Sequence, residues 1–130
     1  MTTAFVLSGG GSLGAVQVGL LQALAARGES PELLVGTSAG AINAAYLAGH
    51  GTSADSLATL AESWARLRRR DVFPIRPARH LLALNGARES MFSSDGLRHL
   101  IGNLLPYRHL QDAPIPAHVA RDCRVAQRGR

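Results

Sequence analysis

A Gly-x-Ser-x-Gly turn supplies the residue best suited to nucleophilic chemistry. It reads Gly36-Thr37-Ser38-Ala39-Gly40 and lies between a short apolar run and a longer apolar segment. In a strand-to-helix turn, this spacing holds the serine hydroxyl clear of the sheet, and the two glycines let strand and helix pass closely. The pattern therefore predicts Ser38 as a nucleophile, with the backbone N–H of Ala39 pointing at the developing oxyanion.

A second glycine-rich turn lies upstream, after another short apolar run. Its glycines are Gly9, Gly10, Gly11 and Gly14. Successive glycines at a strand end let backbone N–H groups converge where no side chain shields them, in front of a helix N-terminus. Such a turn stabilises negative charge, either the phosphate of a ligand or the oxyanion of a tetrahedral intermediate.

The spacing of this upstream turn also fits the Gly-x-Gly-x-x-Gly fingerprint of dinucleotide-binding folds. That site requires an Asp or Glu at the end of the second strand, to hold the ribose hydroxyls. The second apolar run ends without an acid, and Glu29 and Glu32 lie before it, at its wrong end. A dinucleotide-binding domain is therefore the least favoured interpretation.

Alternating strands and helices are expected to position both turns. Residues 4–7 and 33–35 are apolar runs typical of buried strands, and each is followed by an apolar helical segment, from Ala15 to about Gly28 and from Gly40 to about Gly49. This order predicts an α/β fold with three layers (α/β/α) and a mainly parallel central sheet. Both turns then emerge at the same carboxyl edge of adjacent strands, and residues 115–120 predict a third strand.

The helix faces are predicted from apolar spacing. A third helix is expected to be capped by Thr52 or Ser53, with Asp55 near its positive end. Short helices are also expected at 78–84 and from 93 or 94 to 104. The buried face of the first helix is predicted to hold Val16, Leu20, Leu21 and Leu24. That of the third is predicted to hold Leu57, Leu60, Ala61, Trp64 and Leu67.

The composition indicates one globular domain spanning residues 1–130. The chain has 46% hydrophobic residues and a formal charge of +5, and all 14 basic residues are Arg. These arginines are not interleaved with aromatic residues, which disfavours nucleic acid and fits peripheral contact with an anionic membrane surface. One cysteine, Cys123, allows no intrachain disulfide, and the N-terminus lacks the features of a signal peptide. A cytoplasmic location, with peripheral contact to a membrane, is expected.

The two turns together resemble the patatin-like phospholipase family, and the resemblance extends over the whole chain. It is carried by residues 5–21, FVLSGGGSLGAVQVGLL, and by residues 35–44, VGTSAGAINA. The resemblance implies hydrolysis of ester bonds in phospholipids, lysophospholipids or acylglycerols by a Ser–Asp dyad, through an acyl-enzyme. By that resemblance Ser38 is the nucleophile, and the N–H groups of Gly9, Gly10 and Gly11 hold the oxyanion. It implies no metal and no organic cofactor.

The dyad aspartate is not identifiable in this sequence. The family places it in an Asp-Gly-Gly or Asp-Gly-Ala turn beyond the third strand, and no such turn occurs here. Asp95 precedes a glycine but is expected to start a helix, and Asp122 matches a position that relatives fill with a non-catalytic Asp. Asp71 and Asp112 are interpreted as loop residues. The histidines, each interpreted as a surface or loop residue, are His50, His80, His99, His109 and His118.

Two hypotheses follow from the missing base. The first is an acyl hydrolase represented by a domain that is incomplete at its C-terminus, after about three strands, and nearly inactive in isolation because nothing else deprotonates Ser38. The second is a non-catalytic remnant or acyl-binding module.

Overall fold

In the computed structural model, the described residues are 1–67 and 101–120. The elements are β1 (Ala4–Leu7), α1 (Leu13–Ala26), β2 (Leu33–Thr37), α2 (Ala39–His50), α3 (Ala54–Arg66), the 3-10 helix η1 (Leu110–Asp112) and β3 (Ala117–Ala120). Residues 101–104 are also helical. The helix predicted at 78–84, the first part of the one predicted at 93–104 and the tail 123–130 lie outside the described residues.

The strands form one parallel sheet in the order β1-β2-β3. Leu7 pairs with Gly36 across β1 and β2, and Thr37 pairs with Ala120 across β2 and β3. The carboxyl ends of the three strands therefore lie at one edge, as the sequence predicts. The α/β class with a parallel sheet is confirmed.

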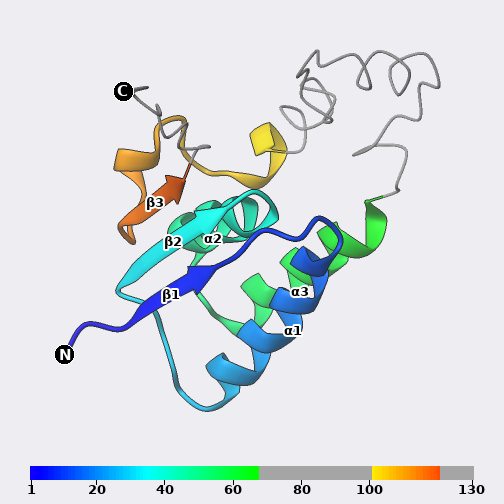
Figure 1. Ribbon diagram of the computed structural model, residues 1–130, viewed down its shortest axis with the longest axis horizontal. Helices are drawn as coiled ribbons and strands as arrows, with labels where there is room; N and C mark the ends of the chain where they lie inside the picture. The colour runs from blue at the N-terminus through cyan, green and yellow to red at the C-terminus, as the bar shows by residue number, and fades with distance from the viewer. Residues whose placement is uncertain (68–100, 121–130) are drawn as a thin grey trace, which may run out of the picture.

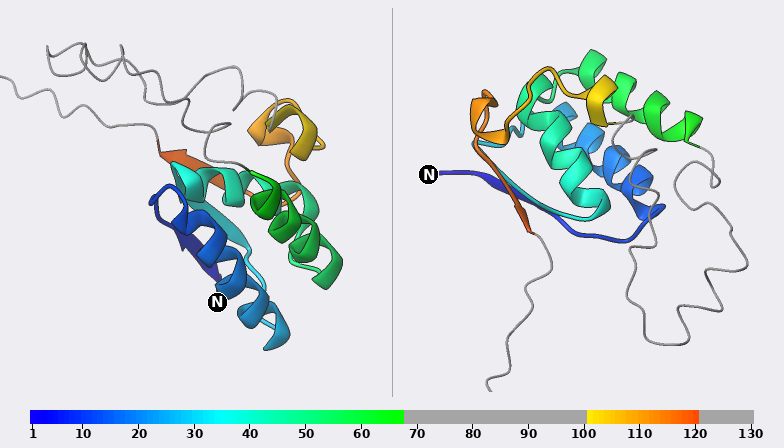
Figure 2. Two further views of the ribbon diagram at one scale, coloured as in Figure 1. Left: turned by 90° about the vertical axis from the view of Figure 1, so that its right-hand side faces the viewer. Right: turned by 90° about the horizontal axis from the view of Figure 1, so that it is seen from above.

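The described helices cover one face of this sheet (Figures 1 and 2). Parallel strands are connected by right-handed crossovers, and a chain that adds β2 and then β3 in the same direction places both crossover helices on the same side. The view from above in Figure 2 shows α1, α2 and α3 together on that side. A second helical layer on the opposite face, as in the predicted three-layer arrangement, is not present among residues 1–67 and 101–120.

The core lies between the sheet and α2, which contacts all three strands. Strand alternation directs Phe5, Leu7 and Leu34 toward the helices, and all three are buried. Val6, on the opposite face, is 73% exposed. From α2, Leu47 is fully buried against these strands.

The predicted buried face of α1 is wrong in part. Leu21 is buried, but Val16 and Leu20 are 67% and 59% exposed, and Leu24 is only partly buried. The helix packs on α3 and α2 instead through the side that carries Gly14, Val18 and Leu21. Apolar residues of α1 occur on all sides of the helix, so their spacing alone could not indicate which side faces the core. Its exposed stripe begins at Leu13, next to the glycine-rich turn.

The third helix follows its prediction closely. Ser53 is the N-cap, and its Oγ accepts a hydrogen bond from the N–H of Ser56 at 3.2 Å. Leu57 and Leu60 are buried, and Trp64 is partly buried against the core.

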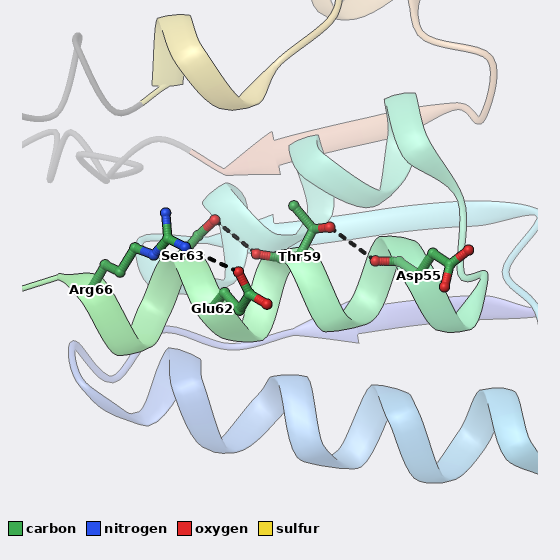
Figure 3. A network of polar contacts seen from close by, with 5 residues as sticks. All are labelled: Asp55, Thr59, Glu62, Ser63 and Arg66. Atoms are coloured by element: carbon green, nitrogen blue, oxygen red, sulfur yellow. Dashed lines mark hydrogen bonds and ion pairs between the residues drawn. The ribbon is translucent and has the colours of Figure 1, made fainter.

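Figure 3 shows the opposite, solvent-facing side of α3, where the hydroxyls of Thr59 and Ser63 donate to carbonyls one turn earlier and Arg66 pairs with Glu62 at 3.2 Å. None of the helices in the described ranges is both long and apolar enough to cross a membrane.

Candidate active site

Ser38 occupies a strained turn between β2 and α2. Its backbone has φ 53° and ψ −121°, and it is the only non-glycine residue with positive φ in the described chain. Such a conformation costs about 1–3 kcal/mol and persists only where the surroundings enforce it. Serine at a helix N-cap ordinarily accepts a hydrogen bond from the first turn. The Ser38 side chain makes no such bond, so its hydroxyl is left free for other partners.

The glycines two residues before and after Ser38 are required by close backbone contacts. A Cβ at Gly40 would overlap the carbonyl oxygen of Leu7 at the end of β1 and lie 2.6 Å from that of Ser8. A Cβ at Gly36 would lie 2.6 Å from the Cα of Ala41 in α2. The backbone of the turn thus packs closely against the end of β1 and the start of α2, and this packing enforces the conformation of Ser38.

The glycine-rich turn after β1 exposes backbone donors. Gly10 and Gly11 have φ values of 151° and 57°, which side-chain-bearing residues rarely adopt. Their carbonyls accept hydrogen bonds from the N–H groups of Leu13 and Gly14, each at 3.1 Å, and therefore point toward the first turn of α1. The N–H groups of Gly10 and Gly11 form no hydrogen bond with any other described residue.

The two turns lie directly against each other. A Cβ at Gly9 would be 3.1 Å from the Cβ of Ser38 and 3.8 Å from its Oγ. A Cβ at Gly14 would be 3.1 Å from the Cβ of Ala39. The structure therefore gathers around Ser38 the glycines of both turns, although their sequence positions are well separated.

This arrangement can stabilise an oxyanion beside a nucleophile. The first N–H groups of α2, including that of Ala39, have no partner within the helix, and the helix dipole places partial positive charge at the same end. Unpaired N–H groups of the facing glycine turn add a second set of donors. Preorganised donors of this kind stabilise the charge of a tetrahedral intermediate without reorganisation during the reaction.

Neither described aspartate lies at this end of the molecule. Asp55 follows the C-terminal end of α2, and Ser38 precedes its N-terminal end. The 12 residues of α2 separate these ends by about 18 Å. Asp112 lies in η1, three residues before Ile115, whose N–H donates to the carbonyl of Ala48, also near the far end of α2. Asp71, Asp95 and Asp122 lie outside the described residues.

The described histidines are not placed beside Ser38 either. His50 ends α2, stacks on Tyr46 and contacts the carbonyl of Leu104 at 2.8 Å. His109 precedes η1, and His118 pairs with Val35, on the sheet face that the described helices leave uncovered. His80 and His99 lie outside the described ranges.

One residue next to the site was missed by sequence reasoning. Asn43 lies in α2, is 0% exposed, and hydrogen-bonds to the turn at Gly14, to Gln17 and to Trp64. A single amide within the apolar segment AGAINAAYLAG was the available signal, because a buried amide must find partners.

Comparison with known proteins agrees with the geometry. The family model described as patatin-like phospholipase matches residues 5–128. Patatin-like phospholipase domain-containing protein 7 of Rattus norvegicus is 34% identical over 113 residues, which cover 87% of this chain and 8% of the rat protein. The Mus musculus protein of the same name gives the same identity and coverage. No solved structure matches significantly. The chain belongs to the patatin-like phospholipase family.

Proposed function

We propose that this chain supplies the nucleophile and the oxyanion hole of a serine hydrolase that acts on carboxylic esters of lipids. The substrates would be phospholipids, lysophospholipids or acylglycerols. The observation that carries the proposal is the close packing of the glycine-rich turn on Ser38, because a Cβ added at Gly9 would lie 3.1 Å from the Cβ and 3.8 Å from the Oγ of that side chain. Family membership supports lipid ester hydrolysis in general.

In the proposed reaction, the Oγ of Ser38 attacks the ester carbonyl and gives up its proton to a general base. The N–H groups of Gly9, Gly10, Gly11 and Ala39 hold the resulting oxyanion. Collapse of the tetrahedral intermediate releases the alcohol, which takes up the proton, and leaves the acyl group on Ser38. A water molecule activated by the same base then releases the fatty acid. In a Ser–Asp dyad that base is an aspartate.

The ester turnover of the isolated chain depends on whether a general base lies beside Ser38. Asp55 and Asp112 are at the far end of α2, so neither can take the proton of Ser38 in the described arrangement. Loss of general-base assistance lowers rates by about 10²–10⁴-fold. We therefore expect the isolated chain to turn over simple esters only weakly. The chain spans 8% of the length of the relatives it matches.

We also propose that the exposed stripe of α1 contacts the lipid surface that holds the substrate. Leu13, Val16 and Leu20 are 58–67% exposed, and Leu13 packs on Gly10 of the glycine-rich turn. Arg27, exposed just beyond the end of α1, and the net charge of +5 favour an anionic surface. Co-sedimentation with phosphatidylserine vesicles should fall for Leu20→Ser and should not change for Thr59→Ala on α3. Equal sedimentation of both variants would refute the contact.

Labelling with alkyl fluorophosphonates tests the proposed function. These reagents phosphonylate a serine hydroxyl that acts as a nucleophile beside an oxyanion hole, and their fluoride leaving group reduces the need for a general base. We expect an adduct on Ser38, absent from Ser38→Ala, that forms faster with a long alkyl chain than with a methyl group. A chain that binds the long-chain reagent without forming an adduct would support the acyl-binding module instead.

A further inference from the structure

We infer that Asn43 is a positioning residue that holds the glycine-rich turn in register with the nucleophile. This inference rests on the proposed function and adds to it a residue for which neither turn motif gives a role. Asn43 lies on α2, the helix that begins immediately after Ser38. Its side chain reaches across to α1 and α3, and thus ties the nucleophile helix to the opposite wall of the site.

Three hydrogen bonds define the contact. The Nδ2 of Asn43 donates to the carbonyl of Gly14 and to the Oε1 of Gln17, each at 3.0 Å. Its Oδ1 accepts from the Nε1 of Trp64 at 2.8 Å. Both amide hydrogens and one acceptor position are therefore used, which accounts for an amide that is 0% exposed.

The network reaches both ends of the glycine-rich turn. Gly14 closes the turn at its C-terminal end, and Ser8 precedes it at the other end. The Nε2 of Gln17 donates to the carbonyl of Ser8, while Gln17 itself accepts from Asn43. Residues 9–13 thus lie between two carbonyls that the network fixes. Asn43 binds the carbonyl of Gly14 directly and that of Ser8 through the side chain of Gln17.

This connection matters because the turn itself is conformationally permissive. Glycine has no Cβ, so local sterics restrict the backbone of this turn only weakly. Contacts with other residues must therefore fix the directions of the N–H groups of Gly10 and Gly11. Misplacing a catalytic group by about 1 Å can cost about 10²-fold in rate. An apolar residue at position 43 could fill the same space but could not hold the two carbonyls.

Asn43→Leu and Gln17→Met test the inference, with Tyr46→Phe as the matched control. Leu and Met approximate the replaced volumes and remove the bonds to the turn. Tyr46 also lies on α2, and its hydroxyl donates to the carbonyl of Ser56 at 3.0 Å, away from the turn. All three variants therefore lose hydrogen bonding of partly or fully buried groups, but only two lose it at the glycine-rich turn.

The first readout is the fluorophosphonate labelling rate of Ser38, measured on the folded fraction. We expect a drop of about tenfold to a hundredfold for Asn43→Leu and Gln17→Met, and a rate within threefold of the parent for Tyr46→Phe. Equal rates for parent and Gln17→Met, or an equal drop for Tyr46→Phe, would overturn the inference. Gln17→Met keeps the test decisive if Asn43→Leu fails to fold.

The second readout does not depend on reactivity. Amide hydrogen exchange of the peptide covering residues 9–14 should quicken in Asn43→Leu and Gln17→Met but not in Tyr46→Phe. If the parent chain is not labelled at Ser38, the proposed function fails, and this exchange measurement still decides the role of Asn43. Unchanged exchange in both network variants would refute that role.

Discussion

Gly14→Ala is expected to destabilise the fold by displacing Trp64. A Cβ at Gly14 would lie 2.5 Å from two carbons of the Trp64 ring, whereas carbon atoms in contact are about 3.5–4.0 Å apart. The ring must therefore withdraw by about 1 Å. Its Nε1 is hydrogen-bonded to Asn43 at 2.8 Å, so this withdrawal also disturbs a buried acceptor.

The magnitude follows from these two contacts. Overpacking of this kind costs about 1–3 kcal/mol. Weakening the bond to a buried amide adds about 1 kcal/mol. Alanine gains up to about 1 kcal/mol over glycine in a helix, which offsets part of the loss. The expected net change is a loss of about 1–3 kcal/mol in the free energy of unfolding.

Gly19→Ala is the matched control on the same helix. A Cβ at Gly19 has no heavy atom within 4 Å, so this substitution should stabilise the fold by about 0.5–1 kcal/mol. Urea unfolding can be followed by the fluorescence of Trp64, which is the only tryptophan. Gly14→Ala should lower the midpoint and alter the native emission, while Gly19→Ala should raise the midpoint. If the two variants have equal midpoints, the contact between α1 and Trp64 is not as described.

Three further changes test other parts of the structure. Ser38→Gly should stabilise the fold by about 1 kcal/mol by relieving the strained turn, as urea unfolding would show, while Ser38→Ala should not. Gly40→Ala should lose its cooperative unfolding transition in circular dichroism, because its Cβ overlaps the carbonyl of Leu7; native-like melting would contradict this. Burial raises the pKa of Tyr107 above its usual value of 10.0, so its contribution to stability is complete below that pH and is lost as pH rises through the folded pKa. The parent should therefore lose more stability than Tyr107→Phe as the pH rises above about 10, and parallel losses in the two proteins would refute the assignment.

The parts of the site that the sequence predicted depend on local spacing. Gly36 and Gly40 flank Ser38 at the distance that a strand-to-helix turn demands, and the contacts of Leu7 and Ala41 explain that demand. The parallel sheet followed from the alternation of short apolar runs with helices, and right-handed crossovers then determine the side on which the helices lie.

The parts that were missed depend on contacts between distant segments. The buried side of α1 could not be chosen from a helix that is apolar all around, and Gly14 marks it only because Trp64 packs there. Asn43 lies within residues 35–44, which carry the family resemblance, but its partners come from two other helices. No spacing rule in one segment predicts such partners.

The most direct test of the account is the fate of an acyl group offered to Ser38. The folded chain would be incubated with p-nitrophenyl octanoate, quenched in acid, digested and mapped by mass spectrometry. A good leaving group reduces the need for a base in acylation, whereas deacylation still needs an activated water, so the acyl-enzyme should accumulate. The account predicts octanoyl on the peptide that contains Ser38, lost in Ser38→Ala and diminished in Asn43→Leu. An unmodified Ser38, or octanoyl spread equally over other serines such as Ser12 and Ser56, would contradict it.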